Sequence, residues 1–172
     1  MIQRGNRLYK DPIIQKVIDV LNEKGPSKLR NRYINGNILI PKQSELPVCY
    51  ITKDTISKQP ADNMEDEHLQ NLVATIILDM TNDLNQIYNM VSGDSELYEL
   101  CEARDYETYE LKPDTILSVL SSVQQIDNNF WIGLGSPVEI NYGLGIERRG
   151  PGIFSVEATI RFTARLHLSV PQ

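Results

Sequence analysis

The 172-residue chain has only two cysteines and two histidines, which leaves few side chains for metal or redox chemistry. Cys49 lies in an apolar, strand-like run, and two buried thiols are the simplest interpretation of such a pair in a cytosolic chain. Neither His68 nor His167 stands in an H-x-x-x-H or C-x-x-C context, so metal ligation has little support. We therefore expect two free thiols and no metal or cofactor.

The sequence also lacks a long apolar run. No segment approaches the roughly 18 apolar residues that cross a membrane, and the basic N-terminus leads into no apolar signal core. The apolar fraction of 41% and the charged fraction of 23% are ordinary for a globular protein. These features predict a soluble protein, made in the cytoplasm, with the length of a single domain.

Sequence motifs for catalysis or phosphate binding are missing as well. The stretch 143–150 contains G-x-G and the basic pair Arg148 and Arg149, but a strand rather than a helix is expected to follow it. A phosphate loop needs a helix N-terminus there, and no Gly-Lys-Ser/Thr occurs, so a hairpin connection is the better interpretation. Cys101 has no motif that places a histidine beside it as a base. We predict that the protein is not an enzyme.

Calcium binding and sequence-specific DNA binding are equally unsupported. The acidic stretch 62–67 lacks the central glycine and the final glutamate of a calcium loop. The basic residues between positions 4 and 32 come without an aromatic platform or a helix-turn-helix motif. We interpret both stretches as solvated surface.

The clearest pattern that is present runs from Phe154 to Val170. Every even position is apolar and every odd position is polar or charged, which predicts one β-strand with a dry face and a wet face. At about 3.3 Å per residue such a strand spans about 55 Å, far beyond the usual five or six residues. Because a small domain cannot easily pair so long a strand with its own neighbours, we predict that part of it, or its polar face, meets another subunit.

Charge is distributed unevenly along the chain. Residues 1–59 hold eleven Lys/Arg and five Asp/Glu, whereas residues 60–110 hold thirteen acids and one base. Residues 111–172 hold five of each. Opposite poles on one molecule suit head-to-tail contacts between copies in a ring, although a solvated acidic insertion explains the same numbers.

The remaining elements follow from local patterns. Asp11-Pro12 begins a helix that runs to Lys24 before Gly25-Pro26. In the first half of the chain we predict a loop at 31–37, strands at 38–40, 47–52 and 69–80, and a helical turn at 83–91 that ends at 92–94. In the second half we predict a helix or irregular insertion at 95–110, a helix at 113–127, a strand or extended arm at 131–142, a glycine-rich connection at 143–152 and the terminal strand at 153–170. This order predicts an α+β fold in which helices pack on one face of a mainly antiparallel sheet. We expect one domain over 1–172, with an acidic insertion around 83–111 and a hairpin arm around 135–152.

This layout resembles the tail terminator and tail-completion proteins of long-tailed bacteriophages. The resemblance is carried by the helix at 12–24, the strand at 46–51, the polar connection into Leu72–Met80, the helix at 113–126 and the final pair that ends with 153–170. It covers most of the chain as an order of elements. It implies a virion protein, assembled in the host cytoplasm, that forms a ring of commonly six copies around the path of DNA. Such a ring joins the tail tube to neck or connector proteins, without catalytic residues and without a membrane.

Five basic residues are our candidates for contacts with a neighbouring subunit or with the tube. Arg148 and Arg149 form an adjacent pair on the glycine-rich connection, and Arg161, Arg165 and His167 lie on the wet face of the terminal strand. We expect the two strand arginines to pair mostly with acids of a neighbour, so that DNA passes without being gripped. Two alternatives stay open: another virion joint, such as a head-completion adaptor or a baseplate component, and a small enzyme whose site shows no motif.

Overall fold

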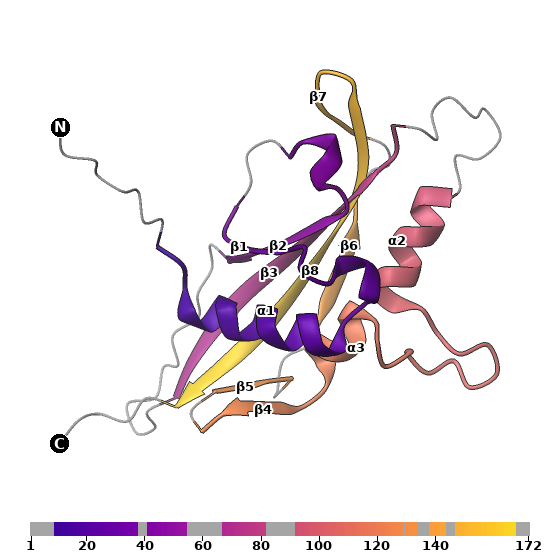
Figure 1. Cartoon of the computed structure of the whole chain (residues 1–172). Helices are drawn as coiled ribbons and strands as arrows, with labels where there is room; N and C mark the ends of the chain where they lie inside the picture. The colour runs from indigo at the N-terminus through magenta and orange to yellow at the C-terminus, as the bar shows by residue number, and fades with distance from the viewer. Residues whose placement is uncertain are drawn as a thin grey trace, which may run out of the picture.

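Two long antiparallel strands form the centre of the computed structural model (Figure 1). β3 (Glu67–Asp79) pairs with β8 (Ile153–His167) from Glu67 opposite His167 to Asp79 opposite Ser155. The structure describes residues 9–37, 41–54, 67–81, 92–128, 130–133, 138–143 and 147–167, and for residues 67, 68, 92–95, 147–149 and 167 it describes the backbone alone. The strand predicted at 38–40, the helical turn at 83–91 and most of the linker before β3 lie outside these residues.

Shorter strands extend the sheet on both sides of this pair. β2 (Val48–Lys53) lies antiparallel to β3, and β1 (Tyr33–Asn35) lies parallel to β2 at the edge. On the other side, β8 pairs successively with β7 (Glu147–Gly150), β6 (Glu139–Tyr142) and β5 (Phe130–Ile132), and β5 pairs with β4 (Gln124–Asp127). The sheet is therefore mixed but mostly antiparallel, as predicted.

Other strands of the same chain pair with β8 along both of its edges. One edge of β8 pairs with β3 along residues 155–167, and its other edge pairs with β7 at 153–155, β6 at 158–161 and β5 at 164–166. The expectation that a small domain cannot pair so long a strand with its own neighbours is therefore wrong, whereas a subunit contact through the polar face of β8 stays a prediction. Three short strands arranged end to end satisfy one edge of a strand that no single neighbour could cover.

The helices lie over one face of the sheet (Figure 1). α1 (Pro12–Lys24) has the predicted bounds, because the Asp11 carboxylate caps its first turn and Gly25 ends it. α2 (Ser92–Glu102) and α3 (Ile116–Ser121) complete the layer, and two 3-10 turns, η1 (Ser27–Leu29) and η2 (Gln43–Glu45), connect neighbouring elements.

The core lies between these helices and the even-numbered face of β8. Along that strand the side chains from Val156 to Ala164 at even positions are all at most 2% exposed, as the alternation predicted. β3 is covered on much of both faces: Ile76 is buried in the main core, and Ile77 packs on the opposite face with Leu46 and Val48. Burial of each large apolar side chain contributes roughly 1.5–3 kcal/mol to the stability of this arrangement.

The predicted helix at 113–127 was wrong in its second half. α3 ends at Ser121, where the Ser122 hydroxyl donates to the Ser118 carbonyl at 2.6 Å and the Gln124 side chain donates to the Val119 carbonyl at 2.6 Å. Residues 124–127 then pair with β5 instead. Val123, an apolar residue within the predicted helix, is 66% exposed. The apolar residues of 113–127 recur every three or four positions. This spacing fits one long helix, but it also fits a short helix followed by a strand.

Three smaller differences concern segments expected to be irregular. The predicted loop at 31–37 contains β1, and the glycine-rich connection contains β7. Residues 92–94 begin α2 rather than ending a helix, so the ambiguous stretch at 95–110 is helical only in its first half. Each of these short elements is stabilised by pairing or packing with a distant segment, which local sequence does not record.

Candidate interaction surfaces

The second face of the sheet carries two of the predicted contact residues. Arg161 of β8 lies between Val73 of β3 and Glu139 of β6, and Arg165 lies between Leu69 of β3 and Trp131 of β5. The two arginines are four positions apart on the strand, so both side chains belong to the same face. Arg161 is exposed and Arg165 is half-buried.

Arg161 pairs with an acid of its own chain. Its Nε atom lies 3.6 Å from Asp54 Oδ2, and the two side chains are 63% and 19% exposed. The sequence predicts that the strand arginines pair mostly with acids of a neighbouring copy. Arg161 instead pairs with Asp54, an acid of its own chain that directly follows β2.

Hydrogen bonds across the strands give this face its polar character. The Thr163 hydroxyl donates to Asn71 Oδ1 at 2.9 Å, and Thr159 donates to the Asn141 carbonyl at 3.5 Å. A shallow hollow beside them is lined by residues of β6 and β8, namely Glu139, Ile140, Asn141, Thr159 and Arg161. The oppositely charged Glu139 and Arg161 lie across from each other at one end of the hollow, which therefore offers a polar contact surface.

Arg148 and Arg149 lie far from the strand arginines. Arg148 is opposite Phe154 in the β7–β8 hairpin, and the register shifts between Arg148 and Gly150. The hairpin turn uses Gly152 at φ +72°, a conformation that favours glycine. Figure 1 shows this hairpin extending beyond the end of the sheet. Position 154 and Arg165 are eleven residues apart on β8, or about 35 Å, so the five predicted residues do not form one cluster.

The backbone of His167 pairs with Glu67 at the far end of β8, whereas the side chains of Arg148, Arg149 and His167 lie outside the described ones.

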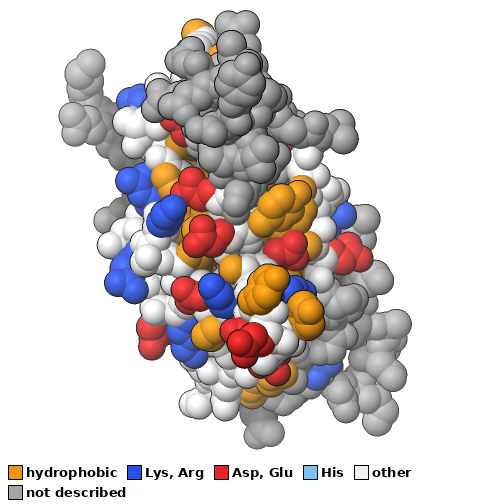
Figure 2. All heavy atoms as spheres, turned by 90° about the vertical axis from the view of Figure 1, so that its right-hand side faces the viewer, with side chains coloured by type: hydrophobic (Ala, Val, Ile, Leu, Met, Phe, Trp, Pro, Cys, Tyr) orange, Lys and Arg blue, Asp and Glu red, His pale blue; other side chains and the backbone are white. Residues whose placement is uncertain are grey.

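A second surface, which the sequence patterns did not indicate, is formed by the turn that follows α2. Arg104 and Leu111 form a two-residue antiparallel bridge, and we name residues 104–111 the tyrosine turn. Within it Tyr106 is 93% exposed and Tyr109 is 73% exposed. Figure 2 shows hydrophobic side chains interspersed with acidic and basic ones on the side of the molecule that carries α2. The sequence Asp105-x-x-Thr108 was the available signal, because an aspartate that bonds backbone groups two and three residues ahead is typical of a turn.

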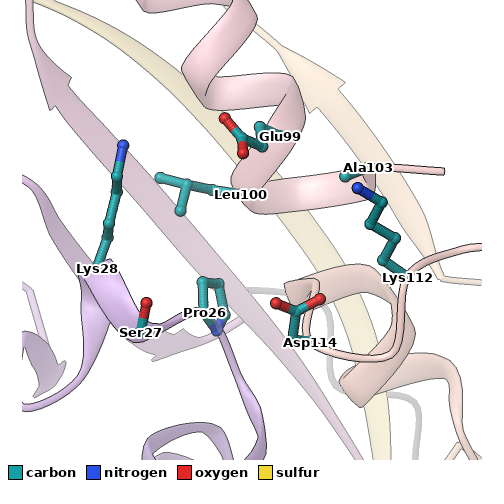
Figure 3. Close-up of a pocket in the computed structure, with 8 residues that line it drawn as sticks. All are labelled: Pro26, Ser27, Lys28, Glu99, Leu100, Ala103, Lys112 and Asp114. Atoms are coloured by element: carbon teal, nitrogen blue, oxygen red, sulfur yellow. The ribbon is translucent and has the colours of Figure 1, made fainter. Parts of the chain in front are cut away.

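A small pocket lies at the base of this surface (Figure 3). It has a volume of about 160 Å³ and is lined by Pro26, Ser27, Lys28, Glu99, Leu100, Ala103, Lys112 and Asp114. Beside it Lys28 Nζ lies 2.7 Å from Glu96 Oε1, and this hydrogen bond raises the pKa of Lys28. The volume is below the roughly 300–1,000 Å³ of typical ligand pockets, and its charges have both signs. We therefore assign no substrate to it.

The cysteines are placed as structural thiols. Cys49 and Cys101 are both buried and free, and burial raises the pKa of the Cys101 thiol to about 12 and that of Cys49 still further. Because the thiolate is the nucleophilic form, these environments oppose nucleophilic chemistry. Among the described residues no group of three His, Cys, Asp or Glu side chains could hold a metal ion, and no described helix is long and apolar enough to span a membrane.

The chain matches no protein family model, and no curated protein is significantly similar to it in sequence. The argument for function therefore depends on the surfaces and the layout described above.

Proposed function

We propose that this protein is a structural component of a bacteriophage virion, which forms a ring that caps the tail tube and joins it to the head. The observation that carries the proposal is the order and packing of the elements. A capped helix, an antiparallel strand pair, two further helices in the same layer and a long C-terminal strand with a projecting hairpin follow one another along the chain. This order resembles the tail terminator layout.

The surfaces fit a role in assembly better than a role in catalysis. The cysteine thiols are buried and protonated, and the described pocket next to α2 is small and mixed in charge. By contrast, the β7–β8 hairpin and the tyrosine turn project from the fold, where a neighbouring protein can contact them (Figure 1). The partners under this proposal are further copies of the chain, the tail tube protein and a neck protein.

DNA passes through such a ring without specific binding. Arg161 is paired with Asp54, which leaves less free positive charge on the second face of the sheet for phosphate. The chain as a whole carries a net charge of −6, which disfavours tight binding of a polyanion.

Light scattering coupled to size-exclusion chromatography tests the ring, and electron microscopy of purified protein mixed with tail tubes tests its place. We expect a closed oligomer that binds one end of each tube. A chain that remains monomeric at high concentration, with or without tubes, would contradict the proposal. A closed oligomer that binds heads or baseplates but not tubes would favour another virion joint.

A further inference from the structure

The tyrosine turn presents two aromatic rings to solvent on an ordered backbone. Asp105 Oδ1 accepts hydrogen bonds from the backbone of Glu107 and of Thr108, each at 2.9 Å, and Arg104 Nη1 donates to the Tyr109 carbonyl at 2.8 Å. The Asp105 backbone N–H donates to the Glu110 carbonyl at 2.8 Å. These bonds fix the turn although nearly all of its side chains are exposed.

Exposed tyrosines on a fixed backbone suit an interface. Tyrosine brings a large contact area at a low entropic cost, and it is enriched among the few residues that dominate binding energy. Tyr106 has 93% of its surface exposed, and Tyr109 adopts φ +60°, which is uncommon for a bulky residue. A turn that only connected α2 to α3 would not need either ring.

The charges around the two rings are mainly negative. The segment from α2 to the start of α3 holds two bases, Arg104 and Lys112, and a larger set of acids, which comprises Asp94, Glu96, Glu99, Glu102, Asp105, Glu107, Glu110 and Asp114. A partner surface for this turn therefore needs positive charge around an apolar floor.

One surface of the same chain has these properties. A hollow of about 710 Å³, which we name the arginine groove, is lined by Arg30, Asn31, Arg32, Ile34, Glu45 and Val48. Ile34 and Val48 belong to the small apolar cluster on the second face of the sheet, and Arg30 is exposed. Glu45 is the acid of the groove, and its carboxylate accepts a hydrogen bond from the Lys42 backbone at 2.8 Å.

The turn and the groove lie apart in one molecule. Figure 1 shows the turn extending outward beyond α2 and α3, whereas β1, which supplies Ile34, lies across the sheet from it. A contact between them must therefore join two copies, and it joins unlike surfaces. Repetition of such a head-to-tail contact generates a ring when the rotation closes.

We propose that the tyrosine turn of one copy binds in the arginine groove of the next copy. This inference rests on the proposed ring and names the surfaces that close it. Tyr106 and Tyr109 are the anchors over the half-buried Ile34, and the exposed Arg30 faces the acids of the turn.

Two variants that each remove one side of the contact provide the test. The turn variant carries Tyr106→Ser and Tyr109→Asn, and the groove variant carries Arg30→Glu. Tyr9→Ser, which removes another tyrosine that is 79% exposed, and Lys10→Glu are the matched controls. We expect each variant to lose at least about tenfold in self-association, as the loss of a main anchor does, while the controls assemble like the wild type.

Mixing the two variants gives the decisive measurement. Each variant keeps one intact surface, so an equimolar mixture should form a heterodimer that cannot grow, detected by light scattering. Thermal unfolding midpoints equal to that of the wild type show that both variants fold.

The outcomes separate this contact from the ring itself. A wild-type ring with variants that assemble normally, or variants that are monomeric but form no heterodimer, would overturn the contact and leave the ring in place. A wild-type chain that stays monomeric would overturn both. Head-to-tail assembly that fails to bind tail tubes would preserve the contact and remove the proposed function.

Discussion

Lys53 Nζ lies 2.9 Å from Asp11 Oδ2, so one ion pair joins the end of β2 to the start of α1. The other oxygen of Asp11 accepts hydrogen bonds from the backbone of Ile13 at 2.9 Å and of Ile14 at 3.2 Å. Burial by itself raises the pKa of Asp11, but the Lys53 ammonium and these two N–H groups together lower it below the ordinary value of 3.8. A single carboxylate thus caps the helix and attaches it to the sheet.

Asp11→Ala should lower the free energy of unfolding at pH 7 by about 0.5–2 kcal/mol, the usual effect of losing a helix cap. Lys53 is half exposed, so the ion pair adds at most about 1 kcal/mol. Because the folded pKa is depressed, the contribution of ionised Asp11 is complete above the unfolded pKa of about 3.9 and is lost as pH falls through the folded pKa. Urea unfolding at pH 7 and pH 2.5 measures both effects.

Asp11→Asn is the control for this prediction, because it keeps an oxygen for the cap and removes the charge. The wild type should be more stable than this variant at pH 7, and the difference should shrink at pH 2.5. An equal difference at both pH values would show that the carboxylate charge contributes nothing.

Phe162→Asp should prevent folding. Phe162 is 2% exposed on the dry face of β8, and a carboxylate buried there would lose its hydration without gaining a partner. Phe162→Ala should lower the free energy of unfolding by about 3–5 kcal/mol. Thr163→Asp, on the other face, should be mild. Circular dichroism and urea unfolding of the three variants check the assigned face, which is wrong if the changes at 162 and 163 are equally harmful.

Arg148→Glu combined with Arg149→Glu should spare folding and impair assembly, because both residues lie in the β7–β8 hairpin that extends from the sheet. An unchanged thermal midpoint together with a reduced yield of joined heads and tails is the expected result. Lys10→Glu with Lys24→Glu makes the same charge change at two exposed positions outside the hairpin, the tyrosine turn and the arginine groove. Normal joining by the double arginine variant would remove the hairpin from the contact surface.

Affinity for duplex DNA should be weak at physiological salt, no tighter than about 10⁻⁶ M, which is the tight end of non-specific binding. The net charge of −6 and the Arg161–Asp54 pair are the reasons. Fluorescence anisotropy with several duplex sequences measures it. Sub-nanomolar, sequence-dependent binding would place the chain among DNA-binding proteins instead.

Both thiols should react slowly with iodoacetamide at pH 8 in the folded protein. Burial raises the pKa of Cys101 to about 12 and shields the sulfur, and Cys49 is buried as well. Mass spectrometry should find rapid double labelling only after unfolding in urea. Fast native labelling at Cys101 would show that α2 opens or that its thiol is more acidic than this environment allows.

The elements predicted correctly are those whose residues alone specify them. Asp11, Pro12 and Gly25 set the ends of α1, and the alternation along β8 set which side chains are buried. In both cases the signal comes from residues close together in the sequence, so it can be recognised without knowing which segment packs against the helix or the strand.

The surroundings of the candidate residues depend on contacts that the sequence does not show. The position of Arg161 on the polar face followed from alternation, but its pairing with Asp54 joins residues more than one hundred positions apart. The exposure of Tyr106 and Tyr109 depends on hydrogen bonds that turn the chain back at Asp105, whereas a tyrosine in sequence is as often buried as exposed.

The sequence by itself determined the α+β class, the start and end of α1 and the two faces of β8, because periodicity and capping are local. Only the tertiary structure decided that α3 stops at Ser121, that β7, β6 and β5 together satisfy one edge of β8, and that the tyrosine turn stands apart from the arginine groove. These features depend on which distant segments hydrogen-bond to each other, because every buried backbone N–H and C=O group needs a partner. A short segment can meet this need as a strand or as a helix, and the segment that packs against it decides between them.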